Sequence, residues 1–203
     1  MDIFSRLPFL LAGSVLIVFG YGLYQVPQKV RLRPSVSLLL PIDNWIPFRP
    51  MWTWIYIFAY YPFLTALILN IPDWRDFNSI FLSFMLMLVL HIFISLVFPV
   101  RVPDAWRVGN CDVGVSRKLL SFVQAVDKGG NCFPSMHVAI AVVCAIHLQR
   151  LIDGPGLIDV LIWCFPLMIG ASTVFTKQHY FVDVPAGAAL GLVGWVLYMP
   201  QYF

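Results

Sequence analysis

Long apolar runs alternate with short polar segments along this chain, and this pattern predicts membrane-spanning helices. A helix needs roughly 20 apolar residues to cross about 30 Å of hydrocarbon, and six segments of the sequence approach that length. They lie near residues 8–26, 51–71, 77–99, 134–150, 156–176 and 179–199. We therefore predict an all-α, polytopic membrane protein: a bundle of six transmembrane helices, with a long loop between the third and fourth spans.

Composition narrows the domain organisation. The chain has 203 residues, of which 60% are hydrophobic and 11% charged, whereas a soluble domain carries about 25% charged residues. No segment between the runs is long enough for a soluble domain, so we predict one integral-membrane domain over residues 1–203. The first run is flanked by Arg6 and Lys29 and lacks a small-residue cleavage site, which favours a retained span over a signal peptide.

Two polar motifs lie at the starts of the fourth and sixth runs. The first is Phe133-Pro134-Ser135-Met136-His137, and the second runs from Lys177 through His179 to Asp183. Six spans place both termini on one side of the membrane and both motifs on the other. Ionisable groups at the edge of hydrocarbon are costly and usually functional. The pattern therefore predicts a site at one membrane face.

The spacing within the motifs indicates phosphoryl chemistry. His179 and Asp183 are four residues apart, so on a helix they share a face. A carboxylate on one imidazole nitrogen fixes the tautomer and leaves the other nitrogen more basic, which makes His179 a candidate nucleophile toward phosphorus. His137, when protonated, is a candidate general acid for the leaving group.

Candidate anion ligands surround these three residues in the sequence. Ser135 lies at the first turn of the fourth run, where free N–H groups attract anions. Lys177, Arg101 and Arg107 can neutralise phosphate charge, the arginines in bidentate fashion. Each has a plainer reading, because lysine reaches headgroups from many helix ends and basic loops bind anionic lipids. Their occurrence on one predicted face favours a single phosphate-binding site.

The Pro134–His137 motif, Ser172 and the His179–Asp183 pair together resemble the type 2 phosphatidic acid phosphatase superfamily. The resemblance covers most of the chain and implies a six-helix membrane core. It implies that His179 forms a phosphohistidine, that Asp183 orients it and that His137 protonates the leaving group. Ser135 and Ser172 are then phosphate ligands.

The chain departs from the family pattern in three places. The family's KxxxxxxRP motif is absent, and Arg101 and Arg107 lie about where it belongs. Met136 replaces a glycine, and Thr173 replaces an arginine whose charge Lys177 can supply. The run that begins at Lys177 looks more like the branch containing inositol phosphorylceramide synthase, whose members transfer the phosphoryl head group to an alcohol.

Three functions follow from these motifs. The first is a lipid phosphatase, the second a lipid head-group phosphotransferase using the same histidine chemistry, and the third a non-enzymatic channel, transporter or scaffold. The third is disfavoured because ionisable residues gather at one rim and do not cross the bilayer. We expect a membrane lipid phosphate as substrate, an alcohol or lipid acceptor in the transferase, and no nucleic acid. No cofactor and no metal are expected, since fixed cations and helix N–H groups can stabilise the charge.

Two signals for orientation conflict. Arg6, Arg75 and Arg150 lie on the terminal side, and the other ten of the 13 Lys and Arg residues lie on the motif side. The positive-inside rule then places the motifs in the cytoplasm, whereas the family resemblance places them outside it. Cys111 and Cys132 could form a disulfide in an oxidising compartment, although reduced thiols are an alternative. We expect a bacterial inner-membrane protein whose site faces the extracytoplasmic side.

Overall fold

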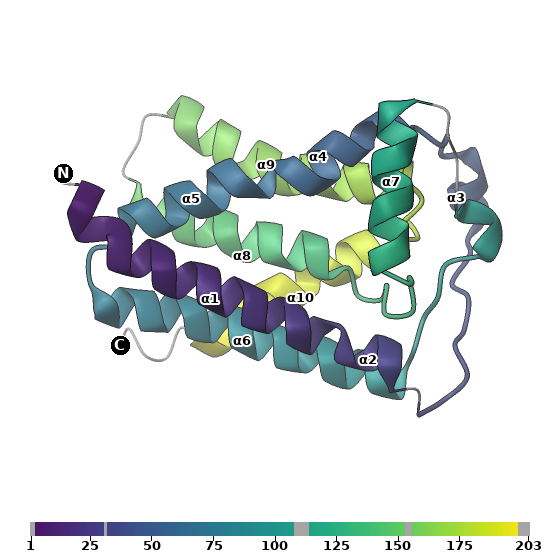
Figure 1. The fold of residues 1–203 in the computed structure, drawn as a ribbon, viewed down its shortest axis with the longest axis horizontal. Coiled ribbons are helices and arrows are strands. Elements are labelled where there is room, and N and C mark those ends of the chain that lie inside the picture. Colours follow the sequence, from purple (N-terminus) through teal and green to yellow (C-terminus); the bar gives the residue numbers. More distant parts are fainter. Residues whose placement is uncertain (1–2, 31, 108–113, 153–155, 199–203) are drawn as a thin grey trace.

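The computed structural model describes residues 3–30, 32–107, 114–152 and 156–198 (Figure 1). Within these ranges every regular element is a helix, and an isolated bridge joins Val36 to Val100. The elements are η1 (Ile3–Arg6), α1 (Leu7–Tyr24), α2 (Val26–Lys29), α3 (Pro41–Trp45), η2 (Pro50–Trp52), α4 (Thr53–Phe58), α5 (Tyr60–Asn70), α6 (Trp74–Val97), η3 (Asp104–Trp106), α7 (Val115–Val126), α8 (Met136–Leu151), α9 (Gly156–Phe175) and α10 (Asp183–Tyr198). The predicted all-α class is confirmed.

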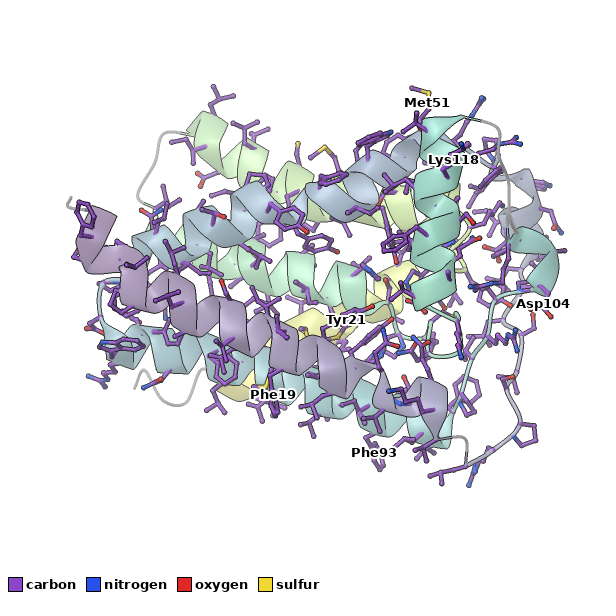
Figure 2. The ribbon with its side chains drawn as sticks, in the orientation of Figure 1. Phe19, Tyr21, Met51, Phe93, Asp104 and Lys118 are labelled. Atoms are coloured by element: carbon purple, nitrogen blue, oxygen red, sulfur yellow. The ribbon has the colours of Figure 1, made fainter. Side chains whose placement is uncertain are left out.

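Four helical segments are long and apolar enough to cross a membrane. They match the first, second, third and fifth predicted spans, and their bounds are Phe4–Lys29, Pro50–Asn70, Trp74–Val97 and Gly156–Phe175. Large apolar side chains such as Phe19 and Phe93 are exposed on the outside of the bundle (Figure 2). A water-soluble protein rarely exposes so much contiguous apolar surface, so these helices indicate an integral membrane protein.

The fourth and sixth predicted spans form shorter helices than the sequence suggested. Helices α8 and α10 have 16 residues each, which at 1.5 Å per residue is about 24 Å and less than the hydrocarbon thickness. The described helices therefore support four spans by length, and the six-span count is not confirmed. Helix α8 packs against α5, α6, α9 and α10 and buries most of its residues. A helix that is apolar on all sides can be a buried core helix as well as a span, and hydropathy alone does not separate the two.

The predicted long loop between the third and fourth runs contains regular structure. Its described part includes η3 and the 12-residue helix α7, which lies across one end of the bundle, roughly perpendicular to the long helices (Figure 1). Val115, Phe122 and Val126 are exposed at positions i, i+7 and i+11, so they share one face of α7. Helix α7 is thus amphipathic. The segment predicted as a long loop therefore contains an ordered amphipathic helix.

The starts of α8 and α10 approach each other very closely. A Cβ atom on Gly187 would lie 2.3 Å from the main-chain oxygen of Ser135, and one on Gly191 would lie 2.8 Å from that of Ala139. Small residues permit such backbone contacts between apolar helices. This contact holds together the N-terminal ends of α8 and α10, where the two sequence motifs lie.

We expect Gly187→Ala to lower the free energy of unfolding in detergent by about 1–3 kcal/mol, because its methyl group meets backbone atoms that cannot turn aside. Gly22→Ala is the matched control, since a Cβ atom there meets nothing within 4 Å. In a helix that change should be neutral or slightly stabilising. Denaturant titration measures both, and equal stabilities of the two variants would contradict the close-packing account.

Candidate active site

The two motif histidines lie side by side, although 42 residues separate them. His137 is in the first turn of α8, and His179 is in the segment between α9 and α10. The Nε2 atom of His179 lies 3.4 Å from Nδ1 of His137, and the ring centroids are 5.6 Å apart. His179 is 3% exposed, so the pair is shielded from bulk water on the side of His179.

The contacts of His179 determine which of its nitrogens carries the proton. Its Nδ1 atom lies 2.8 Å from the carbonyl oxygen of Cys132 and 3.2 Å from Oδ2 of Asp183. A carbonyl and a carboxylate only accept hydrogen bonds, so Nδ1 must donate. In the neutral ring the lone pair therefore sits on Nε2, the atom that faces His137. That is the tautomer a nitrogen nucleophile requires.

Asp183 is fixed by several hydrogen bonds in addition to its contact with His179. It is fully buried, and its Oδ2 also accepts a hydrogen bond of 2.9 Å from the main-chain N–H of Tyr180. Its main-chain oxygen accepts a 3.0 Å bond from the N–H of Ser135. Ser135 in turn is the N-cap of α8, where its hydroxyl accepts from the N–H of Val138 at 3.4 Å. These bonds join the two motifs into one unit.

Two tyrosines that the sequence analysis did not single out contact His137. The hydroxyl of Tyr60 donates to the main-chain oxygen of His137 at 2.8 Å. The hydroxyl of Tyr56 lies 3.4 Å from Nδ1 of the same histidine, and the rings pack with centroids 4.4 Å apart. Their four-residue spacing is that of residues on one helix face. Tyrosines are common near membrane interfaces, so this spacing alone does not indicate a role in the site.

Two of the predicted cations line a hollow beside the segment that carries His179. Lys177 and Arg107 share it with Phe48, Ala105 and Trp106, and its volume is about 210 Å³. The Nζ atom of Lys177 donates to the main-chain oxygen of Asp43 at 2.5 Å and lies 4.8 Å from the centre of the Trp106 ring. Burial lowers the pKa of Lys177, an effect that the Asp43 carboxylate partly offsets.

Both arginines and Ser172, which the sequence predicted as phosphate ligands, make contacts within the protein. Arg101 pairs with Asp104 at 2.8 Å on the surface. Arg107 donates to the main-chain oxygens of Gln124 and Asp127 at the end of α7. Buried Ser172 donates to its own helix, at the oxygen of Ile169.

None of the described hydrogen bonds or ring contacts joins Arg101, Arg107 or Ser172 to either histidine. The structure thus brings His137, His179, Asp183 and Ser135 together, with Lys177 two residues before His179 in the sequence. It gives Arg101, Arg107 and Ser172 partners elsewhere.

Asp43 is a further buried carboxylate at this site, and no motif in the sequence pointed to it. It is 1% exposed on the short helix α3. Its Oδ1 accepts from the N–H of Phe181 at 2.7 Å, and its Oδ2 accepts from the N–H of Leu40 at 2.8 Å. Together with the bond from Lys177 to its main-chain oxygen, Asp43 holds the chain on both sides of His179.

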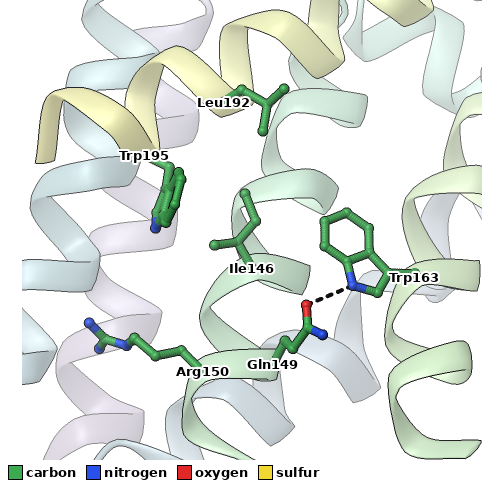
Figure 3. Close-up of a pocket in the computed structure, with 6 residues that line it drawn as sticks. All are labelled: Ile146, Gln149, Arg150, Trp163, Leu192 and Trp195. Atoms are coloured by element: carbon green, nitrogen blue, oxygen red, sulfur yellow. Dashed lines mark hydrogen bonds between the residues drawn. The ribbon is translucent and has the colours of Figure 1, made fainter. Parts of the chain in front are cut away.

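A larger cavity of about 430 Å³ lies elsewhere (Figure 3). It is near the far end of α8, where the side chains of Gln149 and Arg150 line it with Trp163. His137 and Arg150 are 13 residues apart on that helix, which corresponds to about 20 Å. Trp163 donates to Gln149 at 2.8 Å, and Arg150 pairs with Asp76 at 2.9 Å. This cavity is therefore separate from the histidine site.

Cys111, which could pair with Cys132 in a disulfide, lies outside the described residues. Cys132 is a buried free thiol whose Sγ donates to the main-chain oxygen of Val100 at 3.2 Å. Its main-chain oxygen is the acceptor for His179. Cys132 thus has a place in the site through its backbone.

Comparisons with known proteins show which family the chain matches and which solved structure has a similar fold. A model of the PAP2 superfamily matches residues 22–197, which include every side chain of the site. The crystal structure of LpxE from Aquifex aeolicus has a similar fold, with a TM-score of 0.52 and 19% sequence identity over 89% of this chain and 94% of that one. A search of curated protein sequences finds no significant match.

We expect Asp43→Asn to destabilise the protein by about 1–3 kcal/mol, because an amide presents one acceptor oxygen where the buried carboxylate receives two main-chain N–H groups. Asp104→Asn is the matched control. Its side chain is 79% exposed in a surface ion pair, and such pairs contribute about 0–1 kcal/mol. Thermal unfolding in detergent measures both variants. A loss of stability in Asp104→Asn as large as that in Asp43→Asn would contradict the stabilising role of the Asp43 hydrogen bonds.

Proposed function

This chain belongs to the PAP2 superfamily, and from that premise we propose that it is an integral-membrane lipid phosphatase. It hydrolyses a phosphate ester or diphosphate of a lipid through a phosphohistidine on His179. The observation that carries the proposal is the arrangement of His179, whose Nδ1 proton is held by two acceptors while Nε2 faces His137. A nucleophile and an acid in one adjacent pair are what a double displacement at phosphorus requires.

In the first step, Nε2 of His179 attacks phosphorus as the bond from phosphorus to the leaving oxygen breaks. The leaving oxygen keeps the electron pair and takes a proton from the imidazolium of His137. Positive charge develops on the ring of His179, and Asp183 and the Cys132 carbonyl stabilise it through Nδ1–H. Two nitrogens 3.4 Å apart leave no room for a phosphoryl group between them, so the two imidazole rings move apart as substrate enters.

In the second step, water attacks the phosphohistidine and His137 accepts its proton. The His179–phosphorus bond breaks, and inorganic phosphate and the neutral ring are released. An alcohol in the place of water would make the protein a phosphotransferase, the alternative that the sequence raised. Among the described residues no contact favours an alcohol over water, so hydrolysis is the function we propose.

The N-terminus of α8 supplies stabilisation for the phosphoryl oxygens. Free N–H groups of the first turn and the helix dipole attract anions, and Lys177 adds a cation beside the nucleophile's segment. Fixed donors of this kind stabilise a transition state without a metal. In the described part of the chain, no group of three or more His, Cys, Asp or Glu side chains is arranged to bind a metal ion.

Replacing His179 by Ala should lower phosphate release from short-chain phosphatidic acid by at least about 1,000-fold, because the covalent step is lost. His147→Ala is the matched control, since that histidine contacts Ser83 at 2.9 Å and is absent from the site. It should retain activity at temperatures where it remains folded. Activity of the His179 variant within a few-fold of the parent would end the assignment.

Incubating the purified protein with a chelator should leave phosphate release unchanged, within about twofold, because the proposed charge stabilisation comes from fixed groups. A metal-dependent phosphatase assayed in parallel verifies that the chelator works. Loss of activity that added divalent cation restores would show that a metal takes part in the reaction.

A further inference from the structure

Tyr56 places a hydroxyl beside the group proposed to protonate the leaving oxygen. Tyr56 is 5% exposed, and its Oη atom lies 3.4 Å from Nδ1 of His137. Within the described part of the chain, that nitrogen is the hydrogen-bond partner of this hydroxyl. The tyrosine and imidazole rings pack with planes inclined at 34°. Hydrogen bonds in unliganded active sites are often this long and shorten when substrate binds.

The same nitrogen of His137 also faces the nucleophile. Nε2 of His179 lies 3.4 Å from it, opposite the fixed Nδ1 proton of that ring. When a phosphoryl group occupies Nε2 of His179, the lone pair that faced His137 is used in the new bond. The hydroxyl of Tyr56 is then the contact that stays with Nδ1 of His137.

A phenolic hydroxyl can both accept and donate a hydrogen bond, whereas carbonyl and carboxylate oxygens only accept. Tyr56 can therefore accept from Nδ1–H while His137 is an imidazolium. After Nε2 has given up its proton, Nδ1–H remains, and the same hydroxyl continues to accept from it. The oxygens of Cys132 and Asp183 contact His179 and so leave this role at His137 to Tyr56.

We propose that Tyr56 is a positioning residue for the general acid and that it acts through Nδ1 of His137. This inference rests on the proposed function. As the bond from phosphorus to the leaving oxygen breaks, the oxygen keeps the electron pair and receives the proton of Nε2 of His137. His137 becomes neutral and keeps its proton on Nδ1, where the hydroxyl of Tyr56 holds it.

The proposal predicts a loss that depends on the leaving group. An alkoxide must be protonated as it departs, whereas a nitrophenolate departs without help. For Tyr56→Phe we expect kcat/KM to fall by about 10- to 100-fold with short-chain phosphatidic acid and by less than about twofold with nitrophenyl phosphate. This ratio reports the steps up to departure of the leaving group, so the later hydrolysis of phosphohistidine does not enter. Retained nitrophenyl phosphate hydrolysis also shows that the variant is folded.

Two neighbouring tyrosines provide comparisons. Tyr61→Phe removes a hydroxyl from a side chain that is 63% exposed, and it should change neither rate. Tyr60→Phe removes the bond to the main-chain oxygen of His137. Its loss should be similar for the two substrates, because no proton of His137 is involved.

Equal losses with both substrates for Tyr56→Phe, or no loss with phosphatidic acid, would overturn the role of Tyr56 alone, because the parent enzyme remains active. A parent protein that cleaves neither ester would overturn the proposed function and this inference with it. A selective loss with phosphatidic acid supports both.

Discussion

The close approach of α8 and α10 at their N-terminal ends is the constraint on which the site depends. The absence of a side chain at Gly187 lets the backbone of α10 contact the main chain of Ser135. The N–H of Ser135 also donates to the main-chain oxygen of Asp183. This contact places His137 and His179 within 3.4 Å of each other. A larger side chain at Gly187 would separate the two motifs as well as cost packing energy.

The polar segments outside the long helices complete the site. Asp43 accepts hydrogen bonds from the main-chain N–H of Phe181 and from the side-chain ammonium of Lys177, so it contacts the chain on both sides of His179. Tyr180 extends the same frame, because its hydroxyl donates to the main-chain oxygen of Arg101 at 2.7 Å. These polar segments therefore support the stretch of chain that carries His179, and buried hydrogen bonds of this kind are costly to lose.

Arg107 illustrates how a residue of the expected type can serve another purpose. Arginine near a phosphate motif suggests an anion ligand. Here its guanidinium donates to oxygens at the C-terminal end of α7, where a cation also complements the helix dipole. Lys177, whose ammonium lines the same hollow, has fewer carbonyl partners and is better placed to contribute charge. Residue type alone could not separate these two roles.

The hydrophobic pattern by itself determined that the chain is helical and membrane-embedded, because apolar runs of span length have few other uses. The four-residue spacing also predicted that His179 and Asp183 would be in contact, although His179 lies before the start of α10 and not on the helix. Only the tertiary structure decided that α8 is a short buried helix, that α7 crosses the bundle end, and that Tyr56 and Asp43 reach the site. Those outcomes depend on contacts between segments far apart in the chain, and the periodicity of a single segment carries no information about its neighbours.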